Sequence, residues 1–485
     1  MKNPKLILLL IILLSFVIFY PSLFSFYTND DFFLLKISNA KTITDFFNFF
    51  NLKQGPEGLG MYRPLAMQSF FMLAWRLFNL NPLGLHVISY LFFFGIIYLV
   101  FILIKKLVDN EKIALFASFL YATSSTHFAH LYWLSDFQEL AMTFFFLSGI
   151  WFFIKFINTQ RLIHYFVLLI AFLLSLLSKE TAIVFPFVLG LIYIYFKFTN
   201  KSKIPVKKFI LSLTPIVLLL VGYFYFRFTY YGFPKGVSYI WDFSPRFINT
   251  LFWYVLWAVN IPEMLVDFVG PGLRINLNPL LFWKNYLIVI FTSIFILLTI
   301  LVVNLGEFIR KSKKVDYILF FLGVIWFITT LLPVLFLPWH KFSYYLTLPL
   351  IGIIIPISYL IYKSKNFKFY AIIFSTIWLL LSITNTKLSI RSSWITKGED
   401  TAKNVYAYFK NNEILLNGKN IAFYDTSEDN VYAPWYPSET LKTVLSDNNF
   451  INVFFPEIKS VVYLREKPHN NNQTVDLPAR KFVEY

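Results

Sequence analysis

The chain of 485 residues contains no cysteine, which excludes disulfide bonds, zinc–thiolate sites, iron–sulfur clusters and thiol nucleophiles. Charged residues are also scarce. They make up 14% of the sequence, whereas about 25% is typical of soluble domains, and hydrophobic residues make up 58%. A soluble chain of this composition could not cover its surface with polar groups. The composition therefore excludes a soluble globular enzyme and predicts an all-α polytopic membrane protein.

The sequence also has no glycine-rich phosphate loop, no dinucleotide-binding fingerprint and no internal repeat. Its net charge of +17 would suggest nucleic-acid binding in a soluble protein. Here residues 387–485 are neutral, with twelve basic and twelve acidic residues, so the excess belongs to residues 1–386. There it lies in short basic clusters between apolar runs, which do not converge on one groove. We therefore expect no nucleic-acid partner.

A transmembrane helix needs about 20 apolar residues. With Lys2 and Lys5 in the cytoplasm, eleven crossings place every basic cluster on the cytoplasmic side and leave the C-terminus extracytoplasmic. If the apolar segment 251–269 also crossed the membrane, the basic clusters after it would lie on the extracytoplasmic side. The segment also contains Glu263 and Asp267, so we predict that it is re-entrant or interfacial. The predicted spans of this multi-pass cell-membrane protein are roughly 6–25, 83–104, 113–131, 137–156, 162–178, 181–197, 209–226, 284–306, 316–337, 345–362 and 369–386.

Most acidic residues of the first 386 fall on the extracytoplasmic side in this topology. They are Asp30, Asp31, Asp45, Glu57, Asp136, Glu139, Glu180, Asp242, Glu263 and Asp267. Two interpretations remain open. Positive-inside sorting alone can produce this bias, or carboxylate chemistry occurs at the outer face.

The first outer loop, residues 25–82, is too polar to cross the membrane and too apolar to lie in water. We therefore expect it to lie at the membrane interface. The segments 45–50 and 62–80 are typical of amphipathic interfacial helices, separated by the turn-rich segment 54–58. The loop begins with the adjacent carboxylates Asp30 and Asp31. Neighbouring like charges raise one pKa, which suits a general base, but an acidic pair can also simply stabilise the start of a helix.

Several short segments, in this order, carry a resemblance to a known family. They are the Asp30–Asp31 pair, Tyr62-Arg63-Pro64-Leu65, residues 80–86, His127-Phe128-Ala129-His130, Ser178-Lys179-Glu180-Thr181 and residues 345–352. The chain resembles GT-C polytopic glycosyltransferases, and in particular the membrane half of the transmembrane and tetratricopeptide repeat O-mannosyltransferases and their bacterial relatives. It departs from them in having no helical repeat array.

The resemblance implies a reaction and roles for particular residues. A sugar would pass from a polyprenyl-phosphate donor to a hydroxyl of a lipid, glycan or protein acceptor on the extracytoplasmic face, with Asp30 or Asp31 as the general base. Arg63 would hold the donor phosphate, unless it only anchors the loop at the interface. His340 and Lys341 form a second expected cationic pair for phosphate, with interface anchoring as the alternative.

Two further pairs have open roles. His127 and His130 stand three residues apart on one helix face, where they could bind a divalent metal, line a sugar pocket or pack. Lys179 and Glu180 interrupt an apolar stretch, either as a turn-exposed ion pair or as a donor or acceptor contact. The metal dependence of the reaction stays open.

The composition changes after residue 386. We predict a helix at 398–410, a strand at 420–424, a helix at 439–445 and a strand at 460–464, which form a small extracytoplasmic α/β domain. This domain either selects the acceptor or serves as a structural cap. Alternative functions for the whole chain are a transporter or flippase of a lipid-linked saccharide, for which paired broken helices are expected, and an oligosaccharide polymerase or ligase.

Overall fold

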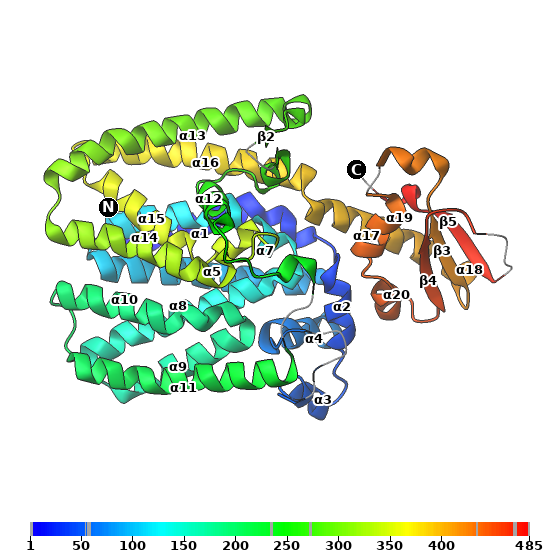
Figure 1. Ribbon diagram of the computed structural model, residues 1–485, viewed down its shortest axis with the longest axis horizontal. Coiled ribbons are helices and arrows are strands. Elements are labelled where there is room, and N and C mark those ends of the chain that lie inside the picture. Colours follow the sequence, from blue (N-terminus) through cyan, green and yellow to red (C-terminus); the bar gives the residue numbers. More distant parts are fainter. Residues whose placement is uncertain are drawn as a thin grey trace.

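The computed structural model describes residues 3–53, 55, 60–232, 236–270, 274–432, 435–468 and 473–483. Long helices run side by side in a bundle, and a small α/β unit projects from one end (Figure 1). Most of the turn-rich segment predicted at 54–58, with Glu57, lies outside the described residues.

Among the described residues, eight helical segments are long and apolar enough to cross a membrane. Two shorter apolar helices, α9 (Leu162–Ser178) and α15 (Leu350–Tyr362), pack against α8 and α14 respectively. All ten fall on predicted spans, and they support a multi-pass membrane protein. The eight segments are α1 with η1 (Pro4–Phe24), α5 (Pro82–Val108), η4 with α8 (Leu134–Thr159), η5 with α10 (Glu180–Phe198), α11 (Val206–Tyr230), α13 (Asn278–Lys311), α14 (Lys314–Leu335) and α16 (Phe367–Ser392).

The predicted span at 113–131 is interrupted. It divides into α6 (Glu111–Ala122), η3 (Ser125–His127) and α7 (Phe128–Tyr132). At the break, the Oδ1 atom of Asn260 accepts hydrogen bonds from the Ser125 backbone N–H at 2.7 Å and the Ser124 hydroxyl at 2.9 Å. A backbone that leaves the helix must find partners elsewhere when water is excluded, and a distant side chain supplies them here.

The segment predicted to be re-entrant or interfacial contains no long helix. Helix α12 (Arg246–Ala258) has 13 residues, so it is about 20 Å long, which is too short for the roughly 30 Å hydrocarbon core. Its buried residues recur with helical spacing along one face. The short η7 (Glu263–Phe268) and a two-strand ladder of β1 (Val269–Gly270) and β2 (Arg274–Ile275) follow it.

The first loop folds into short helices at the end of the bundle that also carries the α/β unit (Figure 1). They are α2 (Asp30–Ile37), α3 (Ile43–Asn48), the π-helix η2 (Leu65–Ser69) and α4 (Phe70–Arg76). We call this end of the molecule the α2 end. The nearby connections hold η6 (Val237–Tyr239) and η9 (Ser343–Leu346).

The α/β unit begins with α17 (Trp394–Asn411), because α16 continues to Ser392, beyond the boundary predicted at 386. Its three parallel strands lie in the order β4-β3-β5. The predicted strands at 420–424 and 460–464 are β3 and β4, whereas β5 was not expected. The elements are α18 (Glu413–Leu416), β3 (Asn420–Tyr424), η10 (Ser427–Tyr432), α19 (Pro437–Val444), α20 (Asn449–Phe454), β4 (Ser460–Leu464), β5 (Thr474–Pro478) and η11 (Ala479–Lys481).

Candidate functional site

The two adjacent aspartates have different environments. Asp31 is 0% exposed, and both of its carboxylate oxygens accept hydrogen bonds. Its Oδ2 atom accepts from the Thr28 backbone N–H at 3.0 Å, and its Oδ1 atom accepts from the Ser135 backbone N–H at 2.8 Å and from the Ser135 hydroxyl. Burial raises the pKa of Asp31 to about 7 against these hydrogen bonds, and the charge of Asp30 adds to the rise. Asp31 therefore joins α2 to η4.

Asp30, in contrast to Asp31, is an exposed residue. The surrounding protein nevertheless displaces water from around its carboxyl group, and this desolvation raises the pKa of Asp30. Its charge acts on Tyr239, whose pKa is raised by burial and lowered by Arg63. Tyr239 thus lies within electrostatic range of both the free carboxylate and the basic residues described below.

The α/β unit fixes the turn that presents Asp30. Asn29 has a left-handed φ of 51°, and its backbone N–H donates to the carbonyl of Val444 in α19 at 2.8 Å. A Cβ atom placed on Gly398 of α17 would lie 2.5 Å from the Thr28 hydroxyl oxygen. Only glycine allows this close approach between α17 and the turn.

Arg63 is buried in a polar network and is not a free cation. It forms a bidentate ion pair with Glu180, with Nε to Oε2 at 2.6 Å and Nη2 to Oε1 at 2.5 Å. Its Nη1 atom donates to Gln138, whose amide donates to the Ser135 carbonyl at 3.0 Å. Because Ser135 also bonds Asp31, one continuous network joins the first loop to two apolar helices.

Arg227, at the end of α11, belongs to the same cluster. It was not among the site residues predicted from the sequence. Its Nη2 atom lies 3.5 Å from Glu180 Oε1, and its Nε atom has no hydrogen-bond partner within the described ranges. Two arginines against one glutamate leave a net charge of +1 at this point. The available signal was a charged residue at the end of a long apolar run, which is costly without a partner or function.

Lys179 and Glu180 do not form a turn-exposed ion pair, so that alternative is wrong. Lys179 is 2% exposed and bonds Glu139 at 2.6 Å, whereas Glu180 bonds Arg63. The Lys179 ammonium also lies over the ring of Tyr345, 4.7 Å from its centroid. Each charge found its partner on another element, because two adjacent residues entering η5 point in different directions.

His127 and His130 are buried and contact each other. His127 Nδ1 lies 3.0 Å from His130 Nε2, and His127 Nε2 lies 2.7 Å from the Tyr121 carbonyl. Asp136 Oδ2 lies 3.9 Å from His130 Nδ1. No group of three or more His, Cys, Asp or Glu side chains with metal-site geometry occurs in the described part of the chain. The geometry favours packing for this pair over the metal or sugar-pocket alternatives.

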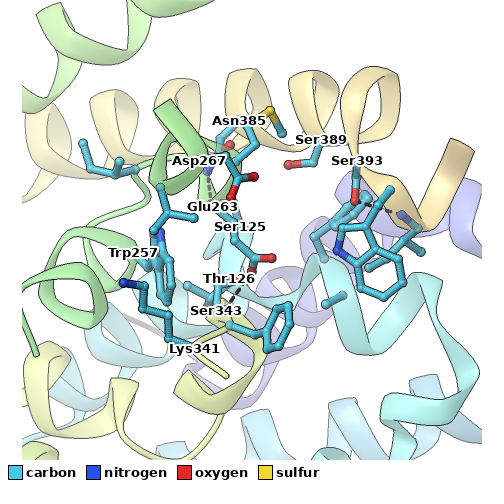
Figure 2. A pocket seen from close by; sticks show the side chains of 18 of the residues that line it. Ser125, Thr126, Trp257, Glu263, Asp267, Lys341, Ser343, Asn385, Ser389 and Ser393 are labelled. Atoms are coloured by element: carbon cyan, nitrogen blue, oxygen red, sulfur yellow. Dashed lines mark hydrogen bonds between the residues drawn. The ribbon is translucent and has the colours of Figure 1, made fainter. Parts of the chain in front are cut away.

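His340 and Lys341 do not act as one cationic pair, and that expectation is corrected. The His340 ring lies tilted against the Tyr239 ring, with 4.1 Å between centroids, and burial lowers the pKa of His340 to about 4, so it is neutral near pH 7. Lys341 instead lines a separate cavity that Asp267 also lines (Figure 2), and its ammonium donates a hydrogen bond to Asn249 at 3.1 Å.

The candidate site is therefore an accessible carboxylate, Asp30, near a buried cluster of positive charge at the α2 end of an apolar bundle. No protein-family model matches this chain, and no curated protein matches it significantly.

Proposed function

We propose that the protein is an integral-membrane glycosyltransferase that transfers a sugar from a polyprenyl-phosphate donor to an acceptor hydroxyl at the α2 end, on the extracytoplasmic face. The observation that carries this proposal is the pairing of one accessible carboxylate with a net-positive buried cluster at one end of a lipid-embedded bundle. A polyprenyl chain stays in the bilayer, so its phosphate must meet the protein at this depth.

The acceptor oxygen attacks the anomeric carbon of the donor sugar. The bond from that carbon to the phosphate oxygen breaks, a glycosidic bond forms, and the acceptor proton passes to the Asp30 carboxylate. The polyprenyl phosphate leaves with the bonding electrons. The raised pKa of Asp30 makes it a better proton acceptor than an ordinary aspartate.

Arg63 and Arg227 stabilise the negative charge of the departing phosphate. Their cluster is already shaped by Glu180, which holds the Arg63 guanidinium in place through two parallel hydrogen bonds. Preorganised charge of this kind stabilises a transition state without reorganising during the reaction. Asp31 is a positioning residue that holds α2 against Ser135.

The matching topology has eleven crossings, with a cytoplasmic N-terminus and an extracytoplasmic α/β unit. Reporter fusions placed after Ser312 and after residue 468 test it, since the first should report the cytoplasm and the second the outside.

The activity test uses the full chain in lipid nanodiscs with radiolabelled polyprenyl-phosphate sugars. Wild type should consume one such donor, and Asp30→Asn should lower turnover by about 10²–10⁴-fold, the usual contribution of a general base. Asp109→Asn is the matched control. Asp109 is exposed, forms an ion pair with Lys201 and has a left-handed φ of 54° that asparagine tolerates.

Full turnover by Asp30→Asn would contradict the base assignment. Donor that crosses the bilayer without being consumed would instead favour a flippase.

A further inference from the structure

A cavity opens at the α2 end, and Asp30 is not among the residues that line it. Its volume is about 500 Å³, within the roughly 300–1,000 Å³ typical of small-molecule sites. It lies between α12, η7, the end of α16 and the start of α17 (Figure 2). Trp339 and the residues from Lys341 to Ser343 also line it.

Indole side chains form part of the cavity wall. Trp257 of α12 is fully buried, whereas Trp339 and Trp394 are 50% and 41% exposed. Trp394 is held by an edge contact with Trp133, at 5.0 Å between centroids. Flat, partly exposed aromatic faces suit the apolar C–H face of a sugar ring, because they bury its area without losing side-chain freedom.

The polar lining provides both donors and acceptors. Glu263, Asp267 and Lys341 are grouped around the opening, with serine hydroxyls from three segments nearby (Figure 2). Glu263 accepts a hydrogen bond from the Ser343 backbone N–H at 2.7 Å, which fixes its direction. Burial raises the pKa values of Glu263 and Asp267 and lowers that of Lys341, so these groups can donate as well as accept hydrogen bonds.

Two buried polar atoms at the cavity are without partners in the described residues. They are Trp257 Nε1 and Asn385 Oδ1. Asn385 is 4% exposed, and its amide nitrogen already donates to Ser125 at 2.7 Å. Buried polar groups are normally hydrogen-bonded, so this donor and this acceptor indicate that a polar ligand or its bridging water completes the site.

We infer that this cavity binds the saccharide portion of a glycan acceptor. The inference rests on the proposed function, since it supplies the hydroxyl that Asp30 would deprotonate. Aromatic faces, carboxyl groups and hydroxyls together match a neutral polyol. The cavity and the basic cluster meet the same short segment, because Lys341 lines the cavity and its neighbour His340 lies within electrostatic range of Lys179 and Arg63.

Binding is tested by saturation-transfer NMR on the full chain in nanodiscs, without donor. The probes are the methyl glycosides of glucose, galactose, mannose and N-acetylglucosamine. At least one should give a saturable signal, and Asp267→Asn and Trp394→Ala should each lower its affinity at least fivefold. Trp435→Ala is the matched control, because Trp435 lies in the α/β unit and is 74% exposed. Asp109→Asn, which lies away from both proposed sites, should bind the glycoside as wild type does.

Absence of binding by all four glycosides overturns the inference, as does binding that both cavity variants leave unchanged in correctly folded, monodisperse protein. A separate measurement follows release of the sugar to water from the donor alone. If donor is cleaved but no glycoside binds, the cavity assignment fails and the proposed function stands. If a glycoside binds through these residues but no donor is cleaved, the cavity remains a glycan site and the transferase proposal fails.

Discussion

The burial of Asp31 makes a prediction about stability and pH. In the folded protein the pKa of Asp31 is about 7, whereas in the unfolded chain it returns to its ordinary value of about 3.9. Between these two values the folded protein keeps a proton that the unfolded chain has released. By linkage, the free energy of unfolding therefore falls as pH rises through this window, and the stability is fully present only below about pH 4.

The magnitude follows from the pKa difference. A pKa difference of one unit corresponds to about 1.4 kcal/mol. The free energy of unfolding should therefore fall by about 4 kcal/mol between pH 4 and pH 7 through Asp31. Asp31→Asn removes the titration. Its side-chain oxygen still accepts from Ser135, but its NH₂ group opposes the Thr28 N–H, which should lower stability by about 1–3 kcal/mol without a pH dependence from this site.

The assay is thermal unfolding in nanodiscs from pH 4.5 to pH 7.5, followed by tryptophan fluorescence. Wild type and Asp109→Asn should lose apparent stability across this range, and Asp31→Asn should lose distinctly less. Parallel pH profiles for wild type and Asp31→Asn would refute the reasoning, because they would show that Asp31 ionises in the folded protein as it does in water.

Two further predictions concern contacts between elements. Gly398→Ala should displace the turn that carries Asp30. We expect a clear fall in kcat with only a small fall in the apparent Tm. Gly306→Ala is the control, because a Cβ atom there meets no neighbour within 4 Å, so the change should be neutral or slightly stabilising. Lys179→Met should cost roughly 3–5 kcal/mol by leaving Glu139 charged and buried, and adding Glu139→Leu should restore much of the loss. A double variant as unstable as the single one would contradict this account of the buried pair.

The long apolar runs determined where most helices lie, because the length and composition of a membrane helix are local properties of the sequence. The short apolar runs of 420–424 and 460–464, rich in aromatic and β-branched residues, likewise determined β3 and β4. The sequence also indicated that Asp30 and Asp31 lie just after the first apolar helix, at the start of another helix.

The tertiary structure alone decided which residues act together. Arg63 pairs with Glu180, 117 residues away, and the break in the third predicted span depends on Asn260. The two aspartates are adjacent and chemically identical in the sequence. In the fold, Asp31 is buried against Ser135, whereas Asp30 is exposed. Burial and the choice of ion-pair partner depend on how distant helices pack, and the spacing of residues along one segment does not contain that information.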